Sequence, residues 1–402
     1  MTSSISKQVK QDCLARALKA ADWFVNSRYQ GDHRFDANTG RCLYYYFMPE
    51  RRSLPGINWS HGRALFVLTE ACKISGDGKY LEAARGYGRF IRALQQLDPN
   101  RPVSHGVFAE ENPTCTYAGI LDGAQAASGL LMLYRVTGEE GWLRGGRAFC
   151  DWLVRNWRPG TALPARVRFD PDTVESDPGW LNKCMHHGSA IPLWHLYSIT
   201  GEGRYVPPLL DAADRILRCQ RPEGPFNFVE STEGVEPPKS NHHEGYGAGD
   251  ERFIIRNDDG IVTVVLAAYK VTGESKYLDA MVRYADWITA QEEMPVRPFV
   301  AFPVQANNAW DTGLVAGKDY SGWILRHLEA RSFTLQVAGT GDPRADGGFR
   351  GEDEEGNAGI YGGEGTDYVL TRGTCYQAGL LFRLSGRGTG AGFSVFGLDR
   401  PK

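Results

Sequence analysis

Apolar residues recur at helical spacing along most of the chain. In 276–292, for example, Tyr277, Met281, Tyr284 and Ile288 fall on one face of a helix. Amphipathic segments of this kind alternate with segments that are apolar nearly all round and rich in Ala, Gly and Ser, as close helix packing requires. The apolar segments are 59–75, 119–137, 184–200 and 257–272, and the amphipathic ones are 78–97, 140–157, 204–220 and 276–292. Helices are also predicted at 8–28, 318–337 and 366–385, with a twelfth near 340–350.

A short turn sequence joins each apolar segment to the amphipathic segment that follows it. It reads Ser-Gly-Asp-Gly-Lys-Tyr-Leu at 75–81 and returns in related form at 137–143, 200–206 and 272–278, with a weaker echo at 385–386. The glycine ends a helix with a positive φ. The acidic residue after it caps or charges the start of the next helix, and the aromatic residue opens the buried face of that helix. Each copy is therefore a tight turn between two antiparallel helices.

About six such hairpins predict an all-α fold, an (α/α)6 toroid with long loops at one mouth. An open superhelical solenoid is the structural alternative, but the repeats differ in length and carry long loops on one side only. Each long loop precedes an apolar helix: 29–58, 98–118, 158–183, 221–256, 293–317 and 339–365. Long loops gathered on a rigid scaffold favour a binding site. We expect one domain over 1–402, with a short flexible tail at 387–402.

The charge and composition of the chain limit the kinds of partner that it is expected to bind. The formal net charge is −3 and no basic block is present, so nucleic-acid binding gains no support. The N-terminus, Met1 to Asp12, lacks the apolar core of a secretory signal, and no stretch approaches the ~18 apolar residues of a membrane helix. A cytoplasmic protein without a membrane partner is therefore expected. The eight cysteines form no C-x-x-C pair, so we expect reduced, mostly buried thiols and no structural zinc.

Polar residues cluster at the predicted starts of the inner, apolar helices. Candidate catalytic residues there are Asp122, His187, Asp258 and Asp259, and candidate substrate-binding residues are Trp59, His61, Arg63, His186 and Tyr320. Helix capping accounts for roughly half of these polar residues. It does not account for the histidines or for the adjacent pair Asp258 and Asp259, in which mutual repulsion could raise one pKa and make an acid.

The segment 239–260 holds the densest polar cluster. His242 and Tyr246 are candidates for proton transfer, and Arg252 or Arg256 could clamp a carboxylate with two hydrogen bonds. Asn241 and His243 are further candidate substrate contacts. The alternative is an exposed charged loop. A metal site is conceivable from His186, His187, His242 and His243, but the H-x-x-x-H spacing of a helical metal site is not present, so we expect no metal and no cofactor.

Aromatic side chains in the predicted loops suit carbohydrate. Trp59, Trp180 and Trp310 lie in loops or just before predicted inner helices. A flat indole ring can cover the C–H face of a sugar while polar side chains bond its hydroxyls. Trp310 is therefore added to the candidate substrate-binding residues.

The helical repeat and the polar starts of the inner helices resemble the (α/α)6-barrel carbohydrate-active enzymes, nearest to the unsaturated glucuronyl and rhamnogalacturonyl hydrolases and the related toroid β-glucuronidases. This resemblance covers about 8–386 and implies that aspartates at inner-helix starts are catalytic. The matching positions are Asp122 and either Asp258 or Asp259. The family's His-Asp-x-Gly-Phe context is missing here, which weakens the expectation of an unsaturated sugar.

The resulting hypothesis is a glycoside hydrolase that acts on uronic-acid-containing oligosaccharides, with an Asp acid–base mechanism. A polysaccharide lyase with a His or Tyr base is one alternative. A sugar epimerase that uses paired histidines is another, and a non-catalytic helical binding scaffold is a third. The sugar, the linkage and the oligomeric state do not follow from the sequence.

Overall fold

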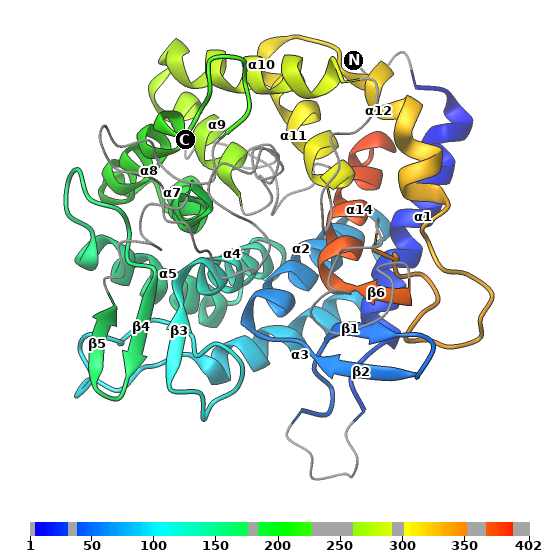
Figure 1. Ribbon diagram of the computed structural model, residues 1–402. Helices are drawn as coiled ribbons and strands as arrows, with labels where there is room; N and C mark the ends of the chain where they lie inside the picture. The colour runs from blue at the N-terminus through cyan, green and yellow to red at the C-terminus, as the bar shows by residue number, and fades with distance from the viewer. Residues whose placement is uncertain are drawn as a thin grey trace.

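The computed structural model describes residues 5–30, 38–175, 184–226, 260–291, 301–351 and 367–388. Within these ranges the chain forms twelve α-helices, which Figure 1 shows as two concentric rings. The inner helices are α2 (Asn58–Ser75), α4 (Ile120–Thr137), α7 (Ile191–Thr200), α9 (Ile261–Thr272), α11 (Ala301–Ala316) and α14 (Thr371–Leu384). The outer helices are α1 (Lys7–Asn26), α3 (Gly78–Leu94), α5 (Glu140–Asn156), α8 (Val206–Arg218), α10 (Ser275–Thr289) and α12 (Ser321–Leu328).

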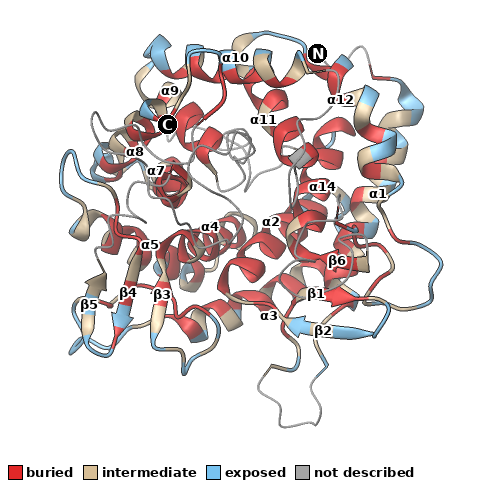
Figure 2. Cartoon of the chain, in the orientation of Figure 1, coloured by how far each residue is buried: buried red, intermediate tan, exposed pale blue. Residues whose placement is uncertain are grey.

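The inner ring is closed. Each inner helix contacts the next around the ring, and α14 returns to contact α2, which excludes the open solenoid. The predicted (α/α)6 toroid is therefore confirmed. The inner helices are buried on nearly every side, whereas each outer helix buries one face (Figure 2). Helices α2 and α4 approach so closely that a Cβ on Gly129 would lie 2.7 Å from the backbone oxygen of Gly62, so both positions require glycine.

The predicted turns connect each inner helix to the following outer helix. Gly76, Gly138, Gly201 and Gly273 adopt φ between 67° and 74°, as the left-handed end of a helix requires. A fifth turn, with Gly317 at φ 70°, lies between α11 and α12. It was not recognised in the sequence because its aromatic residue, Tyr320, stands one position closer to the glycine than in the other copies.

Two expectations about the fifth and sixth hairpins are wrong. No helix forms near 340–350, where the described chain makes turns. The missing helix is α11, in a segment that was expected to be a loop. Its apolar pattern is interrupted by Gln305, Asn307 and Asp311, which are buried in the barrel. Consequently 318–337 contains the outer helix α12, followed by a π-helical turn η4 (Glu329–Phe333), rather than an inner helix.

Short strands lie at the mouth of the barrel, where only loops were expected. Strands β1 (Leu43–Phe47), β2 (Arg52–Pro55) and β6 (Tyr368–Leu370) form one antiparallel sheet in the order β2-β1-β6. Strands β3 (Tyr117–Gly119), β4 (Arg166–Phe169) and β5 (Asp172–Glu175) form another. Because these strands immediately precede α2, α4 and α14 or lie between α5 and α7, they fix the entry of the chain into the inner ring.

The outer helices are linked by a repeated polar contact. A tyrosine near each of four turns donates its hydroxyl to an aspartate of the preceding outer helix. The pairs are Tyr80–Asp22 at 2.8 Å, Tyr205–Asp151 at 2.7 Å, Tyr277–Asp214 at 2.9 Å and Tyr320–Asp286 at 2.7 Å. In each case the lysine or arginine at the same turn also pairs with that aspartate. We call these four contacts the outer-ring links.

Among the described residues, no helix combines the length and the apolarity needed to cross a bilayer. The eight cysteines are free thiols. Burial raises the pKa of Cys13 to about 12, as expected for a reduced, buried thiol.

Candidate active site

The first turns of α2 and α4 meet at the barrel mouth around a buried acid. Glu110, in the loop that leads to β3, is only 6% exposed. Its Oε2 accepts hydrogen bonds from the backbone N–H of Gly119 at 2.8 Å and from the amide Nδ2 of Asn58 at 3.4 Å. The backbone N–H of Asn58 also donates to the Glu110 carbonyl at 3.1 Å. Both neighbouring inner helices therefore position this carboxyl group.

Asp122 lies beside Glu110, in the first turn of α4, and is half-buried. Burial, the negative charge of Asp122 and a hydrogen bond with Asp122 raise the pKa of Glu110 well above its usual range. The bonds from Gly119 and Asn58 oppose this shift without cancelling it. Glu110 therefore holds a proton more tightly than an ordinary carboxyl group, and the two neighbouring acids titrate together.

Gly119 permits the close approach of the two acids. A Cβ at this position would lie 2.9 Å from Oε2 of Glu110 and 3.5 Å from Oδ2 of Asp122. Any larger residue would push Glu110 away from the backbone N–H group that it accepts from. The strand β3 delivers this glycine directly to the start of α4.

Aromatic rings and one arginine pack together near the head of α2, whose first residue, Asn58, donates to Glu110. The Arg63 guanidinium carbon lies 4.8 Å from the ring centre of Trp59 and 5.0 Å from that of Tyr376, on α14. Trp59 also contacts Tyr44 of β1, with ring centres 5.3 Å apart. Trp59 and Arg63 are thus brought together as expected at the head of α2, and Tyr44 and Tyr376 are aromatic neighbours that sequence reasoning missed.

The histidines that were expected at the site lie in different surroundings. His61 is fully buried, with Nδ1 2.8 Å from the carbonyl oxygen of Ile57 and Nε2 accepting from the N–H of Cys42 at 3.2 Å. Burial lowers the pKa of His61 to about 3, so the ring is neutral. Since both ring nitrogens are engaged, His61 has no polar atom for a sugar, and its expected role in substrate binding is wrong.

His186 and His187 lie in the 3₁₀ turn η1 (Cys184–Ala190) that leads into α7. Both are buried, with His187 only 1% exposed. Burial, followed by the charge of Arg215, lowers the pKa of His187 to about 3, so this ring is neutral as well. The two histidines stay candidates as neutral groups at the start of an inner helix.

Two further expected substrate contacts lie elsewhere. Trp310 is not in a loop but in the second half of α11, where it is 4% exposed and packs in the main core. Tyr320 belongs to the turn between α11 and α12, at the end of the barrel opposite the long loops, and its hydroxyl donates to Asp286. The apolar pattern misplaced both residues because it assigned α11 to a loop.

The remaining candidates lie outside the described residues. These are Asn241, His242, His243, Tyr246, Arg252, Arg256, Asp258 and Asp259. Gly260, the first described residue after them, caps the start of α9 with φ 90°. The segment therefore leads directly into an inner helix, and the roles of these residues stay predictions.

Glu110 is the main site residue that sequence reasoning missed. The run Ala109-Glu110-Glu111-Asn112 resembles an ordinary polar loop. Nothing in its local pattern shows that Glu110 is buried while Glu111 faces solvent. Among the described residues, no group of three His, Cys, Asp or Glu side chains is placed to hold a metal ion.

The fold has close parallels among solved structures. An unsaturated glucuronyl hydrolase from Bacillus sp. GL1, described as responsible for glycosaminoglycan degradation, superposes with a TM-score of 0.65 at 16% identity, covering 96% of this chain and 100% of its own. A sugar epimerase from a ruminal bacterium gives 0.64 at 12% identity, covering 92% and 98%. An α-1,6-mannanase of Salegentibacter sp. HEL1_6 gives 0.61 at 12% identity, covering 94% and 99%.

That mannanase is an inactive variant in which two adjacent aspartates are replaced, in complex with α-1,6-mannotetrose. No family model and no curated protein matches the sequence. The chain therefore has the (α/α)6-barrel fold that these carbohydrate-active enzymes share. At sequence identities of 12–16%, the similarity to these proteins is a similarity of fold only.

Proposed function

We propose that the chain is a glycoside hydrolase that acts on uronic-acid-containing oligosaccharides at the mouth of the barrel. The observation that carries this proposal is the Glu110–Asp122 pair, which holds a proton at a pKa well above that of an ordinary carboxyl group. Glycoside hydrolysis needs such a group to protonate the leaving oxygen or the sugar ring near neutral pH. The fold, shared with enzymes that act on sugars, supports the same substrate class.

We infer different roles for the two acids. Paired catalytic carboxyl groups flank a glycosidic bond at about 5–9.5 Å, whereas Glu110 and Asp122 are hydrogen-bonded to each other. They therefore act on the same side of the substrate. Asp122, the more exposed of the two, exchanges the proton with the sugar, and Glu110 is a positioning residue that shares it.

The opposite carboxylate would come from the start of α9, where Asp258 or Asp259 precedes Gly260. An adjacent aspartate pair is also what is replaced in the inactive mannanase. His187, His242 and Tyr246 would orient the substrate or relay protons. Arg252 or Arg256 would bind the uronate carboxylate through two hydrogen bonds.

The test uses an unsaturated glucuronyl disaccharide and follows its ultraviolet absorbance. Hydrolysis removes the conjugated double bond, so the absorbance falls. Asp122→Asn should lower kcat by about 100-fold or more, as expected for loss of a general acid–base group, with an unchanged free energy of unfolding. Asp77→Asn, a conservative change at the exposed cap of α3, should keep the wild-type rate. Wild-type turnover in Asp122→Asn contradicts the assignment.

A sugar epimerase is the second candidate, favoured by the neutral, buried His187 and its neighbour His186 at the start of an inner helix. Two of the structurally similar proteins are sugar epimerases. Proton NMR of cellobiose incubated with the protein separates the two functions, because epimerisation inverts one carbon and releases no monosaccharide. A rise in absorbance with an intact uronate polymer would instead indicate a lyase, and no turnover of any of these sugars would favour a binding scaffold.

A further inference from the structure

A polar cavity of about 400 Å³ opens on the rim of the molecule, where the end of α1, the turn between β1 and β2, and the loop 340–344 come together. Its lining includes Asn26, Arg28, Gln30, Arg51, Asp342 and Arg344. Three of these residues are arginines and one is an acid. The lining contains no aromatic side chain, and Pro343 is its only apolar residue. Such a lining suits a negatively charged ligand with several hydrogen-bonding groups.

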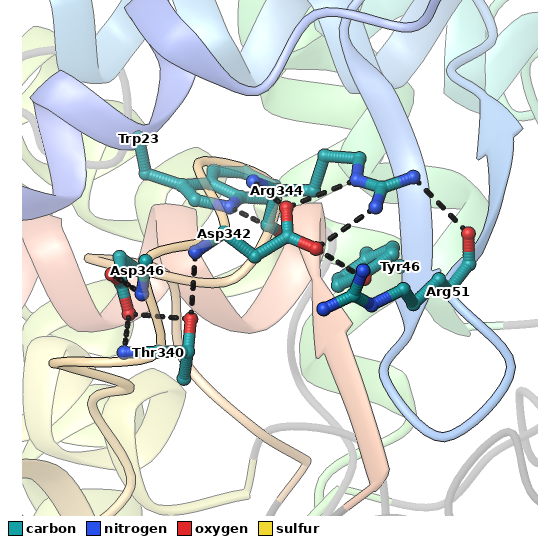
Figure 3. Close-up of polar contacts among 8 residues, drawn as sticks. Trp23, Tyr46, Arg51, Thr340, Asp342, Arg344 and Asp346 are labelled. Carbon is teal, nitrogen blue, oxygen red and sulfur yellow. Dashed lines mark hydrogen bonds and ion pairs between the residues drawn. The ribbon is translucent and has the colours of Figure 1, made fainter.

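One of the three arginines, Arg344, is already paired with an acidic side chain. Arg344 donates to Asp342 with two nitrogens, Nε at 3.0 Å and Nη2 at 2.9 Å, and Tyr46 donates its hydroxyl to the same carboxylate at 2.6 Å. These bonds hold the pKa of Asp342 well below its usual range. The Arg344–Asp342 pair is therefore a neutral, rigid floor for the cavity (Figure 3).

The loop that carries this floor is ordered by its own hydrogen bonds. Asp346 accepts from the backbone N–H of Thr340 and of Gly341, both at 2.9 Å, and from the Thr340 hydroxyl at 2.8 Å. Trp23 of α1 donates its indole N–H to the Arg344 carbonyl at 2.9 Å. The cavity is thus built before any ligand arrives, which reduces the entropy cost of binding.

The other two arginines keep their charge without an acidic partner among the described residues. The Arg28 guanidinium carbon lies 5.8 Å from the centre of the Tyr87 ring, and its Nε is buried and has no acceptor. Arg51 is exposed, at the end of the turn between β1 and β2. In Figure 3 its side chain lies with Arg344 and Asp342 around the Tyr46 ring. An anion in the cavity would satisfy both guanidinium groups.

The backbone at Arg51 supports this assignment. Arg51 is the last residue of the turn between β1 and β2 and has φ 52°, the one non-glycine residue with positive φ among those that the structure describes. Such a conformation is strained for an L-residue that carries a side chain, and glycine would adopt it freely. The Arg344 guanidinium donates to the Arg51 carbonyl at 3.1 Å and holds the turn in place. Arginine at this position supplies a charge where glycine would serve the turn better.

We propose that this rim cavity is a binding site for an acidic sugar, whose carboxylate or phosphate group pairs with Arg28 and Arg51 while Asn26, Gln30 and Thr340 bond its hydroxyls. The cavity volume suits one sugar unit. The site is separate from the Glu110–Asp122 pair, and glucose 6-phosphate, which carries no uronate carboxylate, tests it apart from the activity proposed above. Sheet β2-β1-β6 connects the two regions, since β1 also carries Tyr44, which contacts Trp59 at the mouth.

The test is calorimetric titration of the full chain with glucuronate, glucose 6-phosphate and neutral glucose. The acidic sugars should bind more tightly than glucose, with an affinity that falls as salt rises. Arg51→Gly and Arg28→Gln should each weaken that binding by about fivefold or more, as expected when one charge-assisted hydrogen bond is lost. Binding of only one acidic sugar would identify carboxylate or phosphate as the recognised group.

Arg52→Gln is the matched control, because Arg52 is the exposed neighbour of Arg51, pairs with Glu50 and does not line the cavity. It should bind like the wild type. Arg51→Gly suits its turn conformation, so its free energy of unfolding should not fall, and this variant decides the question even if Arg28→Gln disturbs the contact with Tyr87. Wild-type affinity in Arg51→Gly, or equal binding of glucose and its acidic forms, would overturn the proposal.

Discussion

Glu110 keeps a proton in the folded protein at pH values where the unfolded chain releases it. An unperturbed glutamate has a pKa of about 4.3, and the folded pKa lies well above that. Between these two values the folded state binds more protons, so the free energy of unfolding falls as the pH rises through the window. The stability is fully present below the lower pKa and is lost above the higher one.

The variant Glu110→Gln should remove this pH dependence. Glutamine is permanently neutral, its amide can donate to Asp122 and its carbonyl can accept from Gly119. Relative to wild type, Glu110→Gln should therefore gain stability between pH 5 and pH 8, measured by urea unfolding at both values. If Glu110 also shares its proton with Asp122, the variant should lose the alkaline limb of the pH–rate profile. A stability difference that is equal at both pH values would refute the raised pKa.

The residues of the site were predictable where they stand at the start of a regular helix. The positions of Asp122, Trp59 and Arg63 were predictable because helix starts in a toroid meet at one mouth, whereas their roles stay predictions. Glu110 could not be predicted in this way, because it is held in its buried position by two donors that are far apart in the sequence. These are the backbone N–H of Gly119, before α4, and the side-chain amide of Asn58, in α2. His61 was misjudged for a related reason. Whether a histidine faces a sugar or caps its own helix depends on contacts such as that with Cys42, which lies 19 residues away.

At the scale of the helices, the outer-ring links should stabilise the packing of consecutive outer helices. Tyr277→Phe removes one hydroxyl that donates to a carboxylate, while Lys276 stays 2.9 Å from Asp214. We expect a loss of about 1 kcal/mol in the free energy of unfolding, measured with urea. The control is Tyr134→Phe, whose hydroxyl lies 3.4 Å from Glu140 at an exposed site and should contribute almost nothing. Equal effects in the two variants would mean that the link is not stabilising.

Helices with a regular pattern and a repeated turn were predicted correctly, and the exceptions share a physical cause. The polar residues of α11 are buried within the barrel, but they interrupt the apolar pattern of the segment. The pattern therefore predicted a loop there. A second repeat was hidden by uneven spacing. Gln95, Gln220 and Gln336 each donate a side-chain N–H to a glycine carbonyl of the following loop, but those glycines lie 11, 4 and 11 residues away. Tertiary contacts of this kind leave no periodic signal.

The whole ring closes where α14 meets α11 and α2, and one buried polar network lies at that junction. Arg383 donates to Asp311 at 3.0 Å and to the side-chain oxygen of Asn307. The side chains of Arg383 and Asp311 are 1% and 5% exposed. A buried pair contributes little compared with a well-packed apolar replacement, but the loss of one partner leaves a charge that water cannot reach. We therefore expect the protein to stay stable when Arg383 and Asp311 are both present or both replaced by apolar residues, and to lose stability when only one of them is replaced.

Arg383→Met should cost about 3–5 kcal/mol in the free energy of unfolding. Because an inner ring distributes strain through every neighbouring helix, the loss should appear as one transition at lower urea, seen alike by tryptophan fluorescence and by circular dichroism. The double variant Asp311→Leu with Arg383→Met should regain most of that stability, since it buries no unpaired charge. Lys276→Met breaks a pair that is 46% and 41% exposed and should cost less than about 1 kcal/mol. If Arg383→Met were as mild as Lys276→Met, closure of the ring would depend on apolar packing alone, and the network would serve some purpose other than stability.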